Sequence, residues 1–264
     1  MKLFKFNKEI VLITGASGFL GLQYTDFFCK LGSKVLAIDI IKNKKITILE
    51  KKYKNLKFHF CDITTENSLK NLSKKIKNNS VPTVLINNAA LDFTPEDKTE
   101  YIKPFENFSN EAWRNVMKVN IDGVYLTCKI IGSRMAQKRK GSIINVSSIY
   151  GILSPDPEIY VNKNQKKKFY KPAAYSVSKS AILNFTRYLS VYWAKKNIRV
   201  NNLIIGGMKN KQNKTFVKKY SNRVPIGRMA KVNEYNGSIL FLSTDLSSYM
   251  TGSSLVVDGG WTAI

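Results

Sequence analysis

The feature of this chain that most limits its fold is a regular alternation between short apolar runs and longer amphipathic segments. Seven runs rich in apolar residues are predicted to be strands, at residues 10–13, 34–38, 56–60, 84–86, 142–146, 199–205 and 254–257. The segments between them are predicted to be helices, at residues 18–31, 68–77, 110–136, 174–195 and 234–242, the third being one long helix or two. Apolar strands separated by helices form a parallel sheet that is covered on both faces. We therefore expect an α/β fold, a doubly wound Rossmann-type parallel sheet of about seven strands with helices on both faces.

The length of 264 residues fits one domain of this kind, spanning residues 1–264. Two connections, at residues 91–108 and 151–171, are longer than a minimal fold of this kind needs, and both follow predicted strands. Sheets of this type place their sites at the carboxyl ends of the strands, so long connections there are usually functional. We predict a substrate-side insertion at about residues 152–172 and a substrate loop at about residues 207–224.

The composition argues against several classes of protein. With 43 Lys and Arg against 18 Asp and Glu the net charge is +25, but the lysines form small clusters along the whole chain, so a nucleic-acid partner is not predicted. Because no run of about 18 uncharged apolar residues occurs, we expect no membrane span and a cytoplasmic protein. Cys29, Cys61, Cys128 and the single His59 lack metal-ligand spacing, so no metal site is predicted.

A glycine-rich turn follows the first predicted strand and contains Gly15, Gly18 and Gly21. Glycine lets the backbone approach a pyrophosphate, and the helix that begins there offers free N–H groups to an anion. The second predicted strand ends at Asp39, 18 residues after Gly21. A carboxylate at that position accepts hydrogen bonds from the ribose hydroxyls of NAD and repels the 2′-phosphate of NADP. NAD(H) is therefore favoured, while the lysines at 42, 44 and 45 leave NADP(H) open.

Further short motifs follow in a fixed order after the glycine turn. They are Asp62, the run Asn87-Asn88-Ala89-Ala90, Asn120, the pair Ser147-Ser148, Tyr175 with Lys179, and Asp258-Gly259-Gly260. In this order and spacing, over residues 10–261, the chain resembles the short-chain dehydrogenase/reductase family. The spacing Gly15-x-x-Gly18-x-x-Gly21, with Phe19 where the family's short form usually has glycine, also resembles the extended branch that modifies sugar nucleotides.

The resemblance implies roles for individual residues. Cofactor contacts are expected from two sets: the glycine turn, with Gly15, Ser17, Gly18, Phe19, Leu20 and Gly21, and the residues after later strands, with Asp39, Asp62, Ile63, Asn87, Asn88, Ala89 and Gly206. Catalysis is expected from Asn120, Ser148, Tyr175 and Lys179, with Tyr175 and Lys179 also next to the cofactor. Substrate contacts are expected from Ser148, Tyr160, Tyr175 and Gly207. Asn120 would hold a water that links Lys179 to solvent.

The Tyr175–Lys179 pair carries the expected chemistry. Residues four apart share one face of a helix, so the Lys179 ammonium can lie beside the Tyr175 phenol and lower its pKa from the usual value of about 10. Tyr175 would then exchange a proton as hydride moves, as the acid in reduction and the base in oxidation. A tyrosine and a lysine at this spacing also occur by chance in many helices. It is Asn120, Ser148 and the glycine turn in sequence order that favour the functional interpretation.

Between Ser148 and Tyr175 the chain takes 27 residues, about twice the spacing usual in the family. One hypothesis is a flap over the substrate, with Tyr160, Lys163 and the lysines at 166–168 available for an anionic or hydroxyl-rich ligand. A plain surface excursion is the alternative. The insertion resembles that of reductases linked to bacterial surface-carbohydrate and nonulosonic-acid pathways, which implies a sugar or sugar-derived substrate.

The function expected is therefore NAD(P)(H)-dependent hydride transfer between nicotinamide and a carbinol or ketone of a small, carbohydrate-like molecule. Anionic carbohydrates are among the expected substrates. An epimerase or dehydratase that uses NAD transiently is an alternative, and so is a non-catalytic protein of the same fold that senses dinucleotides or binds nucleic acid. By family resemblance, the helix at 174–195 and the last strand are expected to form the contacts of a homotetramer or a dimer.

Overall fold

The computed structural model describes residues 6–93, 103–160 and 169–264. Within them the chain forms one parallel sheet of seven strands in the order β3-β2-β1-β4-β5-β6-β7. The strands are β1 (Ile10–Thr14), β2 (Lys34–Asp39), β3 (Leu56–Phe60), β4 (Val84–Asn87), β5 (Gly141–Ser148), β6 (Ile198–Ile205) and β7 (Ser254–Val257). The chain builds outward from β1 to β3 and then returns to lay β4 against the other side of β1. This order has a switch point between β1 and β4, where doubly wound sheets bind their ligands, and the predicted fold class is confirmed.

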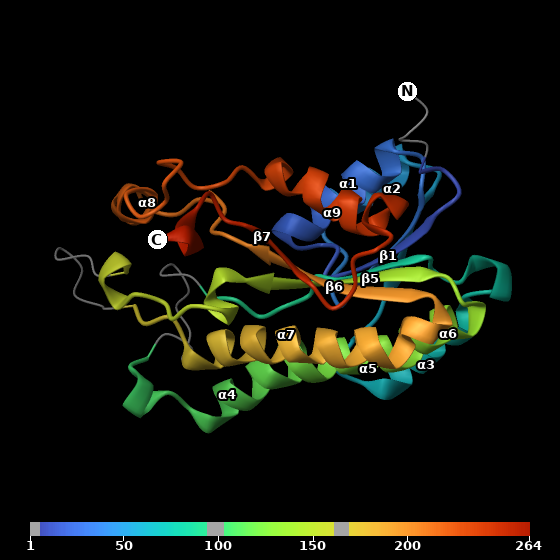
Figure 1. Cartoon of the computed structure of the whole chain (residues 1–264), viewed down its shortest axis with the longest axis horizontal. Helices are drawn as coiled ribbons and strands as arrows, with labels where there is room; N and C mark the ends of the chain where they lie inside the picture. The colour runs from blue at the N-terminus through green and yellow to red at the C-terminus, as the bar shows by residue number, and fades with distance from the viewer. Residues whose placement is uncertain (1–5, 94–102, 161–168) are drawn as a thin grey trace.

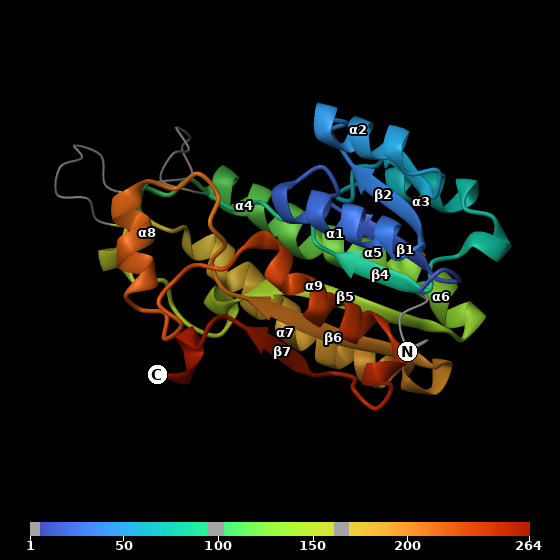
Figure 2. The same ribbon diagram turned by 90° about the horizontal axis from the view of Figure 1, so that it is seen from above.

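Helices cover both faces of the sheet (Figures 1 and 2). One face carries α1 (Phe19–Lys30), α2 (Lys44–Lys52) and α9 (Asn236–Ser243). The other carries α3 (Glu66–Lys75), α4 (Asn110–Met117), α5 (Gly123–Thr127), α6 (Ser133–Lys138) and α7 (Ala173–Trp193). The remaining labelled helix, α8 (Lys214–Ser221), lies outside both layers, beyond the carboxyl ends of the strands and near the C-terminus.

Each face of the sheet buries its own hydrophobic core. The first core packs Tyr24 and Phe28 of α1 against the sheet, and both side chains are fully buried. The second packs Ile131, Met135 and Trp193 against the opposite face. Burying a large apolar side chain contributes roughly 1.5 to 3 kcal/mol, so these two layers hold the helices firmly enough to fix the strand ends between them.

A third, largely aromatic cluster lies beyond the carboxyl ends of the strands. It joins segments that are far apart in the chain: the link after β4, the part of the insertion up to Tyr160, α8 and the C-terminal Trp261. Asp156 of the insertion forms an ion pair with Arg223, and Lys219 of α8 donates a hydrogen bond to the Glu158 carbonyl at 2.9 Å. The insertion and the predicted substrate loop are thus bound to each other.

Two helices were not expected from the sequence. α2 buries only Ile46, so its apolar pattern is weak, and it begins because the Asn43 side chain accepts a hydrogen bond from the Ile46 N–H. α8 lies inside the predicted loop 207–224 and buries only Phe216 and Tyr220. In neither helix is the stripe of apolar residues wide enough to indicate a helix by periodicity alone.

The long helical segment expected at 110–136 is continuous from Asn110 to Lys138. Two π-helical segments interrupt the α-helical pattern, at Lys118–Asp122 and Cys128–Gly132. Among the described residues no helix is both long and apolar enough to cross a membrane.

Candidate active site

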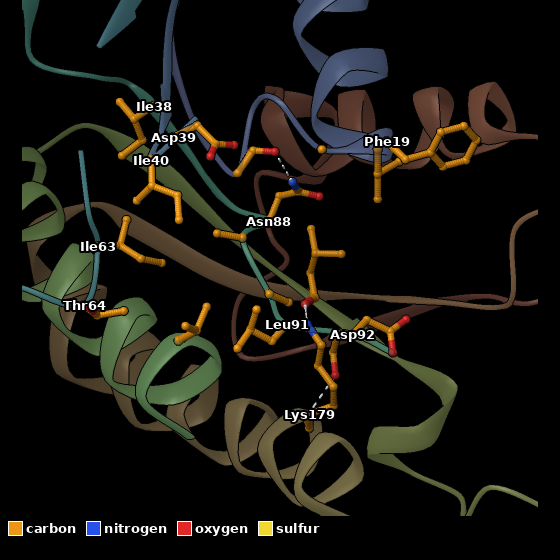
Figure 3. A pocket seen from close by; sticks show the side chains of 18 of the residues that line it. Phe19, Ile38, Asp39, Ile40, Ile63, Thr64, Asn88, Leu91, Asp92 and Lys179 are labelled. Carbon is orange, nitrogen blue, oxygen red and sulfur yellow. Dashed lines mark hydrogen bonds between the residues drawn. The ribbon is translucent and has the colours of Figure 1, made fainter. Parts of the chain in front are cut away.

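A cavity of about 380 Å³ lies at the switch point between β1 and β4. Figure 3 shows Ile38, Asp39 and Ile40 at one end, and Asp92 and Lys179 at the other. Most of the residues expected to contact the cofactor line it: Gly15, Gly18, Phe19, Leu20, Asp39, Asp62, Ile63, Asn88, Ala89, Tyr175 and Lys179. The fold therefore gathers residues from the carboxyl ends of six strands, β1 to β6, and from α1 and α7 around one cavity.

The glycine turn comes so close to neighbouring backbone that side chains are excluded. Gly15 has a φ of +64°, and a Cβ there would lie 2.7 Å from the Cα of Ala89. A Cβ on Gly21 would lie 2.1 Å from the Gly15 carbonyl oxygen. Gly18 is less restricted, since its φ is −74° and an added Cβ would be 3.2 Å from the same oxygen. The turn is thus a narrow backbone cradle at the N-terminus of α1, which suits a pyrophosphate.

Asn88 connects this cradle to the end of β4. Its Nδ2 donates to the carbonyl oxygens of Thr14, at 3.0 Å, and Gly15, at 3.2 Å. Asn87 instead points into the sheet, where its Nδ2 donates to Asn145 Oδ1 at 2.8 Å. Of these two neighbouring asparagines, only Asn88 lines the cavity.

Besides Asn87, three residues of the expected cofactor set do not line this cavity. Ser17 donates its hydroxyl to the Ile41 carbonyl at 2.5 Å, so it ties the glycine turn to the chain after β2. Gly21 is buried beneath Gly15. Gly206 lines a neighbouring cavity at the end of β6 and accepts a hydrogen bond from the Tyr235 hydroxyl at 2.9 Å.

The Asp39 carboxylate is positioned by two backbone N–H groups. Oδ2 accepts from Ser17 at 2.9 Å and Oδ1 from Ile41 at 3.1 Å. A carboxylate offers about four acceptor positions, so capacity remains for two further hydroxyl donors. Lys42 does not neutralise it, because its ammonium pairs with Glu50 at 2.6 Å and lies over the Phe58 ring.

Two further residues of the expected cofactor set, Asp62 and Ile63, follow β3 and line the cavity. Asp62 Oδ1 accepts hydrogen bonds from the Thr64 N–H and hydroxyl, both at 2.8 Å. Ile63 is buried and fits against Gly123 of α5, where a Cβ would lie 2.6 Å from the Ile63 side chain. Both residues line the cavity, and Figure 3 shows Ile63 at the same end as Ile40.

Tyr175 and Lys179 lie on one face of α7 and are both buried. The Lys179 ammonium donates to the Val146 carbonyl at 2.9 Å and lies 5.8 Å from the centroid of the Tyr175 ring. The Ser148 side chain hydrogen-bonds to Tyr175 and accepts from the Tyr150 N–H at 3.2 Å. Ser147 turns the other way and donates to the Lys179 carbonyl at 2.9 Å. The geometry therefore brings Ser148, and not Ser147, together with Tyr175.

Asn120 lies in the π-helical segment at Lys118–Asp122, an irregularity that is common at functional sites. Its side chain accepts from the Leu91 N–H at 2.7 Å and donates to the Leu91 carbonyl at 3.1 Å. It also donates to the Ser178 hydroxyl at 3.0 Å, and Ser178 in turn donates to the Tyr175 carbonyl at 2.7 Å. Asn120 thus fixes the chain after β4 against the turn of α7 that carries Tyr175.

The expected lowering of the Tyr175 pKa is wrong for the protein alone. Burial raises this pKa well above its usual value, and the negative charge of Asp92 raises it further, whereas the hydrogen bond to Ser148 lowers it. Burial also lowers the pKa of Lys179 to about 8, which weakens it as a fixed positive charge. Spacing along a helix places two groups side by side, but burial decides which charge states are favourable.

A second cavity of about 420 Å³ adjoins the first and shares Phe19, Asp92 and Tyr175 with it. The residues expected to contact substrate all line it: Ser148, Tyr160, Tyr175 and Gly207. The Tyr160 hydroxyl is 2.8 Å from that of Tyr150. Lys163 and the lysines at 166–168, which the flap hypothesis invoked, lie outside the described residues.

Sequence reasoning missed several residues of this second cavity, among them Asp92, Tyr150, Lys171, Asn210, Gln212, Phe216 and Tyr220. Tyr150 follows the Ser147-Ser148 pair closely enough to have been considered. Lys171 precedes Tyr175 by one helical turn, which could also have drawn attention. Asp92 lies on the chain after β4, and the other residues lie on the chain after β6 and in α8, where no motif marks them.

The cysteines and acidic residues do not gather into a metal site. Within residues 6–93, 103–160 and 169–264, no group of three or more His, Cys, Asp or Glu side chains could hold a metal ion. The three cysteines are free and buried, and burial raises the pKa of Cys29 and of Cys128 to about 12. These thiols are therefore weak nucleophiles.

Comparison with known proteins agrees with the geometry. A family described as Enoyl-(Acyl carrier protein) reductase matches residues 15–262. Among curated proteins, cyclopentanol dehydrogenase of a Comamonas species is 29% identical over 98% of this chain and 99% of its own length. The 2-dehydro-3-deoxy-D-gluconate 5-dehydrogenase of Dickeya dadantii is 28% identical over 100% of this chain and 99% of its own length.

Solved structures are similar over the whole fold. A short chain dehydrogenase from Leptospira borgpetersenii with bound NAD+ has a TM-score of 0.87 and 31% identity, covering 98% of this chain and 94% of that one. A gluconate 5-dehydrogenase from Burkholderia cenocepacia, in complex with NADP and tartrate, has a TM-score of 0.85 with 100% coverage of both chains, and its 22% identity supports the fold alone. Given the family match over residues 15–262 and the 31% identity to a solved short chain dehydrogenase, this chain belongs to the short-chain dehydrogenase/reductase family of oxidoreductases.

Proposed function

We propose that this enzyme transfers hydride between a nicotinamide dinucleotide, NAD(H) by preference, and a carbinol or ketone of a sugar-derived substrate. The observation that carries the proposal is the position of Tyr175. It lines both cavities, so it stands where a cofactor in the first would meet a substrate in the second. Ser148 and Lys179 contact the two sides of this junction.

The residues of the first cavity fit a dinucleotide. The cradle at Gly15 and Gly21 excludes side chains, and α1 begins there without a side-chain cap, so its N–H groups are free to bind the pyrophosphate. Asp39 would accept the ribose hydroxyls, and Ile63 would pack against the adenine. Asn88 and Lys179 would border the nicotinamide half. When bound, the cofactor supplies or accepts the hydride and, when oxidised, brings a positive charge near Tyr175.

The protein's own residues handle the proton. In reduction Tyr175 donates its phenolic proton to the substrate oxygen, and in oxidation it removes a proton from the substrate hydroxyl. Ser148 hydrogen-bonds to Tyr175 and would share the same substrate oxygen, which keeps the reacting group in line. Lys179 holds the helix to Val146 beside the ring, and Asn120 fixes the turn of α7 through Ser178.

Replacement of Tyr175 tests this role directly. Tyr175→Phe keeps the ring and removes the hydroxyl, so we expect turnover to fall by a factor of about 100 or more, while the Kd for NAD+ stays close to wild type. Tyr249→Phe, at a fully exposed tyrosine that lines neither cavity, is a matched control. Wild-type turnover in Tyr175→Phe would refute the proposed function.

The preference for NAD rests on Asp39. Its negative charge would repel a 2′-phosphate, and Glu50 holds the nearest lysine, Lys42, in an ion pair. We expect kcat/KM to be higher with NADH than with NADPH, and Asp39→Asn to shift that ratio toward NADPH by a factor of about 10. A wild-type enzyme that prefers NADPH would contradict this part of the proposal.

The substrate class rests on the polar groups of the second cavity. Asp92, the hydroxyl pair of Tyr150 and Tyr160, and the amides of Asn210 and Gln212 offer donors and acceptors along its wall. Such a wall suits a hydroxyl-rich molecule better than an acyl chain, because an acyl chain would cover these polar groups without offering them hydrogen-bond partners. One of the relatives compared above is named for a sugar acid, and the net charge of +25 would attract an anionic carbohydrate, including a precursor of surface carbohydrates.

A panel of gluconate, galactitol, cyclopentanol, keto-sugars, sugar nucleotides and a 3-oxoacyl thioester tests this class. We expect the hydroxyl-rich members to give the highest kcat/KM. Best activity with the thioester or with cyclopentanol would contradict the proposed substrate. Conversion of a sugar nucleotide without any net change in NADH would instead favour an epimerase or dehydratase.

Assembly into a dimer or tetramer is also proposed, through α7. This helix exposes Val177, Tyr188, Val191 and Tyr192 on the side away from the sheet, with Val191 79% exposed. Exposed apolar patches of this kind mark protein contacts. Light scattering after gel filtration should give two or four copies, and Val191→Glu should reduce that number. A monomeric wild type would refute the proposal.

We further propose that the protein works in the cytoplasm. Three free, buried thiols suit a reducing compartment, where such groups stay unoxidised. Cell fractionation with an antibody to the chain tests this location, and recovery from an exported fraction would contradict it.

A further inference from the structure

A charged pair, Lys171 with Asp92, lies next to the Tyr175 ring in addition to Lys179. Lys171, just ahead of α7, places its ammonium 4.5 Å from the centroid of that ring, closer than the 5.8 Å of Lys179. The Lys171 side chain is only 8% exposed. An ammonium buried against an aromatic ring is held by the ring's negative face and restrains the ring in return.

Asp92, after β4, supplies the opposite charge. The Lys171 ammonium donates to Asp92 Oδ1 and to the Phe93 carbonyl, the latter at 3.0 Å. The Phe93 N–H donates to the same Oδ1 at 2.9 Å. Asp92 is 48% exposed, and it lines both cavities (Figure 3 places it at the Lys179 end of the first). The pair therefore joins the chain after β4 to the start of α7 at the edge of the reacting site.

We propose that Lys171 and Asp92 are positioning residues that hold the Tyr175 ring and set, by opposing charges, how readily its phenol releases a proton. The inference rests on the proposed role of Tyr175. Lys171 attracts the phenolate and Asp92 repels it, so the balance between them, and not either charge alone, determines the ionisation of Tyr175.

Other groups face Tyr175 and must be kept constant in any test. They come from every element packed on it, namely Lys179 of α7, Tyr150 after β5 and Tyr220 of α8. Burial is the largest cause of the raised Tyr175 pKa, and Asp92 is the charged group that raises this pKa most. Lys171 in turn lowers the pKa of Lys179 while Asp92 raises it, so the pair acts on both expected catalytic groups.

The two partners should change the site in opposite directions. Asp92→Asn removes the negative charge and keeps an amide oxygen for Lys171, so Tyr175 should ionise about 0.5 to 1 pH unit lower. Lys171→Met leaves Asp92 uncompensated and takes away a cation, so ionisation should move up by a similar amount. Lys171→Arg keeps the charge and should restore the wild-type midpoint.

The experiment titrates Tyr175 in the full-length protein saturated with NAD+, from the tyrosinate absorbance of each variant minus that of the same variant carrying Tyr175→Phe. This measurement needs no known substrate. Lys140→Met is the control, because it breaks an exposed pair with Glu9 at the other end of the sheet and removes one positive charge without touching the site. We expect its midpoint to equal wild type.

Opposite shifts in Asp92→Asn and Lys171→Met, with rescue by Lys171→Arg, would establish the proposal. Equal midpoints in all variants, shifts in the same direction, or no ionisation of Tyr175 below pH 11 would overturn it. In that case a loss of thermal stability in Lys171→Met would show that the pair is a structural latch only. The proposed function fails separately, if Tyr175→Phe keeps its turnover.

Discussion

The two cavities of this site, the first proposed for the cofactor (the cofactor half) and the second for the substrate (the substrate half), are held together in different ways. Around the first cavity, backbone meets backbone: Gly21 lies under the Gly15 carbonyl, Gly15 lies against Ala89, and Asn88 donates to the carbonyls of the turn. These contacts depend on the absence of side chains. A few glycines in sequence therefore determine most of the shape of this half.

Around the second cavity, side chains meet side chains from segments far apart in the chain. Asp156 pairs with Arg223, Lys171 with Asp92, and the Tyr150 hydroxyl with that of Tyr160. None of these six residues belongs to a strand of the sheet. The comparison teaches why the cofactor class can be read from motifs, whereas the wall proposed to contact the substrate is one that motifs do not describe.

The largest effect should come from adding one methyl group to the cofactor half. Gly21→Ala places a Cβ 2.1 Å from the Gly15 oxygen, so the turn must shift, and we expect a loss of about 3 kcal/mol in the free energy of unfolding. NAD+ affinity should fall as well, because the cradle moves. Urea unfolding and fluorescence titration with NADH measure the two effects.

Gly18→Ala is the matched control for that prediction. Its φ of −74° suits any residue, and its Cβ would be 3.2 Å from the same oxygen, so we expect less than about 1 kcal/mol. Equal losses in the two variants would mean that glycine contacts do not determine this half of the site.

The second prediction concerns Lys179, at the boundary between the halves. Burial lowers its pKa to about 8, whereas an unfolded lysine has a pKa of about 10.4. Between these values the unfolded chain binds a proton that the folded protein has released, so the free energy of unfolding should rise with pH. For this one group, the rise from pH 8 to pH 10 should be about 2 kcal/mol.

Comparison with Lys179→Met isolates that contribution, because the other titrating groups are shared by both proteins. The difference in unfolding free energy between wild type and variant should change in favour of wild type as the pH rises over this window. The same pH slope in both proteins would show that the Lys179 ammonium is as well solvated as in the unfolded chain.

The strands and the cofactor groove could be predicted because their signals are local. Residues 56–60 and 254–257 were predicted with the observed bounds, and the motif from Gly15 to Gly21 indicated the cradle. The role of Lys171 could not be predicted in this way, because its partner Asp92 lies 79 residues earlier in the chain. The prediction of a lowered Tyr175 pKa was wrong for a related reason, because the sequence indicates which residues are neighbours on a helix but not how deeply they are buried.

The third prediction tests whether the substrate wall acts as a set of pairs. Tyr150→Phe or Tyr160→Phe leaves the other hydroxyl buried without its observed partner, which should cost about 1 to 2 kcal/mol in unfolding free energy. Replacing both removes both hydroxyls, so the double variant should lose no more than either single one. Additive losses in a double-mutant cycle would argue against a coupled pair.

The smallest effect is expected where the insertion is bound to the substrate loop. Arg223→Met breaks the ion pair with Asp156, but the two side chains are 50% and 24% exposed, so the loss of stability should be about 0.5 kcal/mol or less. Substrate KM should nevertheless rise about twofold, because substrate binding must then supply the free energy that the ion pair contributes to holding the cavity wall in place. The Kd for NADH should not change, because the pair does not touch the cofactor half.

Lys129→Met is the control for this prediction. It breaks an ion pair with Glu66 in which the side chains are 47% and 39% exposed, so it should cost similar stability and leave KM unchanged. A KM increase shared by both variants, or a fall in NADH affinity in Arg223→Met, would mean that the two halves of the site are coupled more tightly than their separate contacts indicate.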